Sequence, residues 1–137
     1  MRVVLDTNVL LSALISPHGS PHRLFGAWRA GKFELVTAAE QLDEIRRASR
    51  YPKFRSILQP HLVGTMVNNM QRAIMVGRLV ADIEVDDPFD AFLLAIAQAG
   101  NADYLITGDH RAGLLGRRNF GSTRIMTPAE FCDIVFD

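Results

Sequence analysis

The chain has 137 residues, of which 48% are hydrophobic, so it can bury one core without disulfide support but is too short for two ordinary domains. Lys plus Arg and Asp plus Glu both number 15, which excludes the overall positive charge of a nonspecific nucleic-acid coat protein. We therefore expect a single domain, residues 1–137, and only local contacts with any nucleic acid.

Along the first half of the chain, short apolar runs alternate with amphipathic segments. Runs of β-branched or alternating apolar residues predict strands, and apolar residues spaced three and four apart predict helices. In chain order, this half predicts a strand at 3–5, a helix at 9–15, a helix through 24–28 that stops at Gly31, a strand at 33–37, a helix at 38–49 and a long helix at 60–76.

The second half continues the same alternation. It predicts a short strand at 79–82, a helix at 89–99, strands at 104–107 and 124–126, and a last helix through 131–135. Thr127-Pro128-Ala129-Glu130 has the pattern of an N-cap, a proline at the first helical position and an acid at the third. Strands that alternate with helices predict an α/β fold, with a parallel sheet of about five strands flanked by helices.

Four acidic residues fall at related places in this predicted fold. Asp6 directly follows the first strand, and Asp109 follows the fourth after one glycine. Glu44 lies on the helix after the second strand, and Asp90 lies near the N-terminus of its helix, toward which its side chain points. Functional groups collect beyond the carboxyl ends of parallel strands, so we expect these four carboxylates to converge.

Converging carboxylates resist joint ionisation unless a cation lies between them. Oxygen ligands without cysteine or paired histidine suit Mg²⁺ or Mn²⁺ rather than zinc. One ion polarises a phosphodiester and activates its bound water, and two ions about 4 Å apart clamp both reacting oxygens. Taken singly, each acid is explained as well by a turn, a helix cap or a solvated helix face. Their joint placement predicts metal-dependent hydrolysis.

Six short motifs carry a family resemblance. They are Val-Leu-Asp-Thr-Asn-Val-Leu-Leu-Ser-Ala-Leu-Ile at 4–15, Leu-Asp-Glu-Ile at 42–45, Arg-Tyr-Pro-Lys-Phe at 50–54, Asp-Pro-Phe-Asp at 87–90, Ala-Asp-Tyr-Leu-Ile-Thr-Gly-Asp at 102–109 and Arg-Ile-Met-Thr-Pro-Ala-Glu-Phe at 124–131. In this order they resemble a PIN domain, and specifically the VapC-like group of toxin components from toxin-antitoxin systems. The resemblance covers essentially the whole chain.

The resemblance implies a Rossmann-like parallel sheet and a Mg²⁺- or Mn²⁺-dependent endoribonuclease, with a homodimer and a small antitoxin protein as partners. The family's metal-site acids carry over onto Asp6, Glu44, Asp90 and Asp109, with supporting polar residues at Asn8, Asp87 and Thr107. Many toxin-type relatives have a further aspartate three residues beyond the position of Asp109, where this chain has Ala112. Whether one ion or two would bind is therefore open.

Basic residues follow two of the four acids. One strip comes after Glu44 and a second after Asp109; together they comprise Arg46, Arg47, Arg50, Lys53 and Arg55, and then Arg111, Arg117 and Arg118. Flanking an acidic cleft, such strips would hold RNA phosphates without reading bases. Any single one of these residues could equally well be a solvent-exposed charge on a helix or loop with no role in binding.

Two other functions are less consistent with the sequence. Haloacid-dehalogenase-type phosphatases also have an aspartate after the first strand, but in the pattern Asp-x-Asp-x-Thr, whereas this chain has Asp6-Thr7-Asn8-Val9-Leu10. A catalytically weak PIN-fold interaction module would keep the fold, and the survival of all four acids favours a nuclease over it.

The location of the protein is predicted from two local features. The lone Cys132 cannot form an intramolecular disulfide and lies in an apolar pattern, which predicts a packed, unreactive thiol in a reducing compartment. The first apolar run, Val3-Val4-Leu5, ends at the charged Asp6, too soon for a signal peptide or a membrane span. We therefore expect a cytoplasmic protein.

Overall fold

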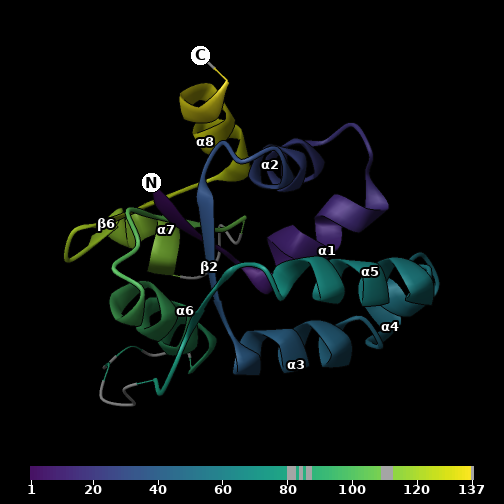
Figure 1. Cartoon of the computed structure of the whole chain (residues 1–137). Coiled ribbons are helices and arrows are strands. Elements are labelled where there is room, and N and C mark those ends of the chain that lie inside the picture. The colour runs from purple at the N-terminus through teal and green to yellow at the C-terminus, as the bar shows by residue number, and fades with distance from the viewer. Residues whose placement is uncertain (80–82, 84, 86–87, 109–112, 137) are drawn as a thin grey trace.

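The computed structural model describes residues 1–79, 83, 85, 88–108 and 113–136 (Figure 1). The strands are β1 (Arg2–Leu5), β2 (Glu34–Ala38), β3 (Ile74–Val76), β4 (Tyr104–Ile106), β5 (Asn119–Phe120) and β6 (Thr123–Met126). The helices are α1 (Thr7–Ile15), α2 (Ser20–Arg29), α3 (Ala39–Ala48), α4 (Pro52–Arg55), α5 (Pro60–Met70), α6 (Pro88–Ala99), α7 (Gly113–Arg117) and α8 (Pro128–Val135). No helix in the described part of the chain is long and apolar enough to cross a membrane.

Within the described residues, the strands form one six-stranded sheet in the order β3-β2-β1-β4-β6-β5. All neighbours pair in parallel except β5, which is antiparallel to β6. The chain runs outward from β1 in one direction through β2 and β3, and it then returns to β4 on the other side of β1. Open α/β sheets have a crevice at such a reversal, beyond the carboxyl ends of the two strands. Here those strands are β1 and β4, with Leu5 paired to Ile106.

Helices cover both faces of the sheet. Successive residues of a strand point to opposite faces, so Val3 and Leu5 lie in one buried cluster and Val4 in the other. The first cluster packs against α1, α2, α3, α5 and α8, and the second packs against α6 and α7. Figure 1 shows α6 and α7 on one side of β2, with α1 and α5 on the other. The predicted α/β fold, with a mostly parallel sheet flanked by helices, is confirmed.

Two predicted elements differ from the structure. The helix predicted over 60–76 ends at Met70, and Ile74–Val76 instead forms β3, which pairs with β2. The four-residue spacing of apolar side chains continues past Met70, but the strand forms because a distant partner completes its hydrogen bonds. Of the strand predicted at 79–82, Leu79 lies in no strand and residues 80–82 lie outside the described residues. The two-residue β5 and the short helices α4 and α7 were not predicted.

The N-terminus of α8 is the predicted capping box. The Thr127 hydroxyl oxygen accepts a hydrogen bond from the Glu130 backbone N–H at 3.2 Å, and the Glu130 carboxylate accepts one from the Thr127 N–H at 3.0 Å. Cys132, on the same helix, is buried as predicted. The helix therefore begins at a position that the local sequence specifies.

Because of these bonds, we expect a pH-dependent contribution of Glu130 to stability. Hydrogen bonds from Thr127 hold the pKa of the Glu130 carboxyl below its ordinary value. The stabilisation is then fully present above the unfolded-state pKa and is lost as pH falls through the folded-state pKa. In urea denaturation, Glu130→Gln should be less stable than wild type at neutral pH, and the difference should shrink in acid. A difference that stays constant with pH would contradict this prediction.

Candidate functional site

Asp6 lies at the crevice between β1 and β4. Its backbone N–H donates to the Ile106 carbonyl oxygen at 2.9 Å, which continues the strand pairing by one residue. One carboxylate oxygen accepts from the Asn8 backbone N–H at 3.2 Å and so caps α1, and the other accepts from the Thr107 hydroxyl at 2.8 Å. The side chain is buried. The strand therefore places the backbone of Asp6, and these hydrogen bonds orient its carboxylate.

The two polar residues predicted beside Asp6 contribute in different ways. Thr107 directly follows β4, is fully buried, and donates its backbone N–H to the Met126 carbonyl oxygen at 3.0 Å. Its hydroxyl reaches Asp6 across the strand boundary. Asn8 is exposed, and it donates its backbone N–H to the Asp6 carboxylate, so its backbone supports the site.

Glu44 lies on α3 with its carboxylate buried. One oxygen, Oε2, accepts from Arg47 Nη2 at 2.6 Å, and this hydrogen bond raises the pKa of Arg47. The other oxygen, Oε1, is buried and has no hydrogen-bond partner among the described residues. A buried polar atom without a partner costs about 1–3 kcal/mol, and more when it is charged. Binding of a hydrogen-bond donor or a cation to Oε1 would therefore be favourable.

Gln41, one turn before Glu44, is a positioning residue that was not among the residues predicted for the site. Its side-chain oxygen accepts from the Thr37 hydroxyl at 2.6 Å, and its amide nitrogen donates to the Leu5 carbonyl oxygen at 2.7 Å. This bond ties α3 to the carboxyl end of β1, directly before Asp6. The sequence carries only a partial signal: Gln41 lies on the inward-facing side of α3 with Ile45, which indicates a buried polar group but does not identify its partner.

Asp90 lies in the first turn of α6 and is buried. Because α6 connects the parallel strands β3 and β4, its N-terminus lies at the same sheet edge as the strands' carboxyl ends. A cavity of about 310 Å³ separates this turn from α3; its lining residues are Glu40, Glu44, Arg47, Pro88 and Phe92. The segments that carry Glu44 and Asp90 therefore face each other.

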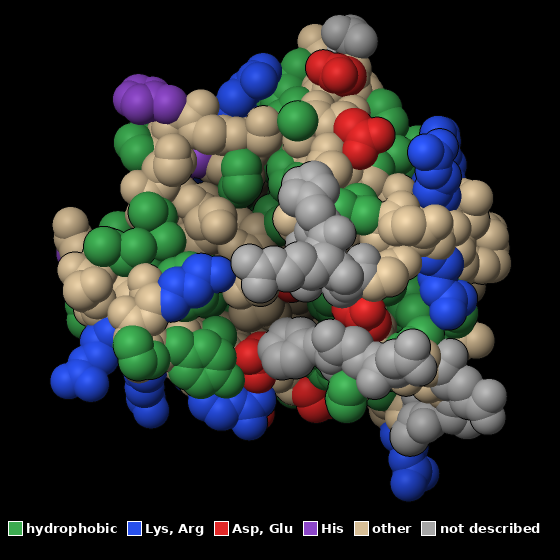
Figure 2. Space-filling view, turned by 180° about the vertical axis from the view of Figure 1, so that it is seen from behind, with side chains coloured by type: hydrophobic (Ala, Val, Ile, Leu, Met, Phe, Trp, Pro, Cys, Tyr) green, Lys and Arg blue, Asp and Glu red, His purple; other side chains and the backbone are tan. Residues whose placement is uncertain are grey.

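The acidic side chains present oxygen ligands, but the described residues do not complete a metal site. Figure 2 shows Asp and Glu side chains close together near the middle of one face, with Lys and Arg side chains beside them and toward the edge. Asp6, Glu44 and Asp90 are buried carboxylates, and Glu44 Oε1 lacks a partner among the described residues, which suits a hard divalent cation. In the described part of the chain, however, no three His, Cys, Asp or Glu side chains are placed to hold one ion.

Several residues predicted for the site lie outside the described residues. They are Asp87, Asp109, Arg111 and Ala112. The fourth predicted metal ligand and the position relevant to a second ion are therefore both among them.

The two basic strips lie on different elements. Arg46 and Arg47 are on α3, Arg50 follows it, and Lys53 on α4 lies 5.0 Å from the centre of the Phe54 ring. In the second strip, Arg117 ends α7, and Arg118 has a positive φ of 61°. The first strip thus follows Glu44 in the chain, on α3 and in the turn after it.

Comparison with known proteins identifies the family. A family model described as PIN domain matches residues 2–111, which is most of the chain and includes all four predicted metal-site acids. No curated protein matches the chain. PIN domains are nucleases that typically use divalent metals. The parallel sheet, the crevice at Asp6 and this match lead to one conclusion: the chain belongs to the PIN domain family.

Proposed function

We propose that this PIN domain is a metal-dependent endoribonuclease that hydrolyses RNA phosphodiester bonds. Asp6, Glu44, Asp90 and Asp109 would hold one or two Mg²⁺ or Mn²⁺ ions. The observation that carries the proposal is the buried Glu44 Oε1, which has no hydrogen-bond partner among the described residues and belongs to a carboxylate facing the start of α6. Membership of a nuclease family supports it.

Hydrogen bonds within the protein orient the carboxylates of Asp6 and Glu44. Asp6 is oriented before any ligand arrives, because the α1 cap and Thr107 each hold one of its oxygens. Arg47 holds one oxygen of Glu44 and leaves the other for a further partner. A bound divalent cation would supply a water of lowered pKa and would polarise the phosphodiester. Such a scheme requires no protein nucleophile.

The test is cleavage of single-stranded and structured RNA with Mg²⁺, with Mn²⁺ and with chelator. We expect Glu44→Gln and Asp90→Asn each to lower the metal-dependent rate by roughly 100-fold or more, because loss of even an outer-shell partner costs a metal site about 10–100-fold. The matched control is Asp43→Asn, because Asp43 is the neighbour of Glu44 but has a side chain that is 73% exposed. The control should cleave like wild type.

Two outcomes would contradict the nuclease proposal. One is cleavage that persists in chelator or in both site variants. The other is a wild-type protein that cleaves no RNA with either metal, which would favour a catalytically weak interaction module. One observation favours that alternative: among the described residues, no three His, Cys, Asp or Glu side chains are placed to hold a metal ion.

We also propose that the nuclease is the toxin of a type II toxin-antitoxin pair, with a small antitoxin as partner and a homodimer as its assembly. The order of the six sequence motifs supports this role. Expression of the wild-type chain alone in bacteria should stop growth, whereas Glu44→Gln should not. Unimpaired growth with soluble wild-type protein present would contradict the toxin role and leave the nuclease proposal intact.

Residues 1–137 are proposed to form one PIN domain, although the family match ends at residue 111. The segment beyond the match supplies β6, which pairs with β4 along three residues. It also supplies Phe131 of α8, which is fully buried and contacts the rings of Phe33 and Tyr104. The C-terminal segment thus completes both the sheet and the core.

A further inference from the structure

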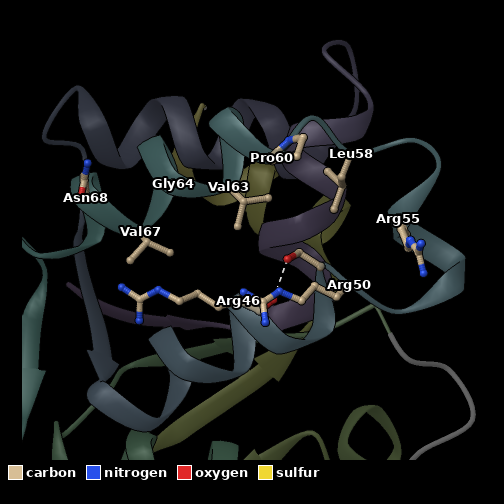
Figure 3. Close-up of a pocket in the computed structure, with 10 residues that line it drawn as sticks. Arg46, Arg50, Arg55, Leu58, Pro60, Val63, Gly64, Val67 and Asn68 are labelled. Atoms are coloured by element: carbon tan, nitrogen blue, oxygen red, sulfur yellow. Dashed lines mark hydrogen bonds between the residues drawn. The ribbon is translucent and has the colours of Figure 1, made fainter.

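A second cavity lies between α3, α4 and α5, away from the acidic site (Figure 3). It has a volume of about 580 Å³, within the range of ordinary small-ligand pockets. We call it the arginine cavity, because Arg46, Arg50 and Arg55 line it opposite a wall formed by Val63, Gly64 and Val67. Figure 3 shows the side chains of Arg46 and Arg50 extending beneath Val63 and Val67.

Few carboxylates balance the positive charge of the arginines in this cavity. Among the described residues that line it there is no Asp or Glu. In the described part of the chain, Arg50 and Arg55 have no carboxylate within 4.0 Å, and Arg46 pairs only with Asp43, at 3.3 Å. That pair is solvent-exposed on both sides, so it contributes little and is readily exchanged for another anion. An anionic ligand would therefore meet the guanidinium groups of Arg46 and Arg50, with Arg55 at the edge of the cavity (Figure 3).

The opposite wall suits the uncharged part of a nucleotide. Val63 and Val67 are buried apolar residues, and between them Gly64 leaves open space, because no atom outside its own helix backbone and chain neighbours lies within 4 Å of where its Cβ would be. Guanidinium groups bind phosphate and also stack on bases, and an apolar wall covers the other face of a base or ribose. The combination matches a nucleotide better than a bare phosphate, which needs no apolar wall.

Arg47 connects this cavity to the acidic site. An α-helix turns by about 100° per residue. Viewed along α3, Arg47 therefore lies roughly 60° from Glu44, and Arg46 lies roughly 160° from Glu44 in the same direction. Arg50 follows in the turn that continues the helix. An RNA backbone that starts at a cation bound by Glu44 would therefore pass Arg47 before it reaches the arginine cavity around the same helix.

We propose that the arginine cavity is a subsite for one nucleotide of single-stranded RNA, which lies beyond the scissile bond and holds the substrate without taking part in the reaction. This inference rests on the proposed ribonuclease function. Single-stranded RNA is favoured over duplex because the base must leave its stack to reach the wall at Gly64. The arginines hold the phosphate, and the wall holds the base.

The first test fills the cavity without changing its charge. Binding of a fluorescently labelled oligouridine is measured by anisotropy in chelator, so that no cleavage occurs. Gly64→Leu should weaken binding about tenfold, because stacking of one base is lost. Gly26→Leu is the matched control, since Gly26 is also an exposed helical glycine with open space around its Cβ position. Thermal melts should show that both variants stay folded.

The second test removes the charge. Arg50→Ala with Arg55→Ala should weaken binding and reduce the salt dependence of log Kd by roughly 0.7 for each phosphate that the protein no longer neutralises. The matched control removes two exposed cations elsewhere, with Arg29→Ala and Lys32→Ala, and should leave both quantities unchanged.

Three results would overturn the subsite. Wild-type affinity in both cavity variants, with metal-dependent cleavage intact, would reject the subsite and keep the proposed nuclease. If polyglutamate displaced the labelled oligouridine as effectively as unlabelled oligouridine does, the cavity would be a site for an acidic protein segment. A wild-type protein that neither binds nor cleaves RNA would reject both the subsite and the nuclease.

Discussion

Asp6→Asn should abolish metal-dependent RNA cleavage, with a loss of roughly 100-fold or more, while the protein keeps its fold. The substitution removes the negative charge at the crevice between β1 and β4. It keeps a side-chain oxygen that can still accept from the Asn8 N–H and cap α1. Stability in chelator should therefore be unchanged or slightly higher, because the proposed convergence of the acids would place like charges near Asp6. Cleavage rates and urea denaturation in chelator measure the two effects separately.

Asp6→Ala separates the charge of this residue from its structural role. Alanine removes the cap of α1 and the acceptor of the buried Thr107 hydroxyl, so a loss of about 1–3 kcal/mol is expected. Both variants should be inactive, and only the alanine variant should be destabilised. Wild-type cleavage by the folded asparagine variant would show that Asp6 serves as a cap and not as a metal ligand.

Phe131→Ala should lower the free energy of unfolding by about 3–5 kcal/mol. Phe131 is fully buried, and its ring lies 5.5 Å from that of Phe33 and 5.0 Å from that of Tyr104, measured between centroids. It joins α8 to residues beside β2 and in β4. Removing the ring leaves a cavity where three separate segments of the chain meet.

The measurement for Phe131→Ala is urea denaturation, with Ile134→Ala as the matched control. Ile134 lies on the same helix but is 39% exposed, so its truncation should change stability by less than about 0.5 kcal/mol. A loss below about 1 kcal/mol for Phe131→Ala would mean that α8 is peripheral. The proposal of one domain over residues 1–137 would then fail.

Elements with strong local signals were predictable from the sequence. The apolar run before Asp6 and the capping box at Thr127 specify β1 and the start of α8 through neighbours in the chain. The end of α5 and the start of β3 have no such signal, since the spacing from Met70 to Ile74 suits a helix. There the pairing of β3 with β2 decides the structure, and that partner lies more than 30 residues away. The short β5 depends on β6 in the same way.

The site was predictable where chain topology determines it and not where tertiary contacts do. The parallel sheet predicts that Asp6 and Thr107 lie at one rim, whereas the pairing of β1 with β4, which brings them together, was not predicted. The bond between Gln41 and the Leu5 carbonyl requires α3 to be docked already, so no spacing rule reveals it. The strip containing Arg46 and Arg50 was visible in the sequence, but the wall around Gly64 comes from a different helix.

Mn²⁺ titration followed by NMR tests most directly the proposal that Asp6, Glu44 and Asp90, together with Asp109, bind a divalent cation at one site. Mn²⁺ broadens the backbone amide resonances of nearby residues, so its location is read without any activity assay. We predict that substoichiometric Mn²⁺ broadens the amide signals of Thr7, Glu44 and Asp90 together, and that Asp6→Asn prevents this. Broadening confined to one of these segments, or centred elsewhere on the protein, would contradict the claim.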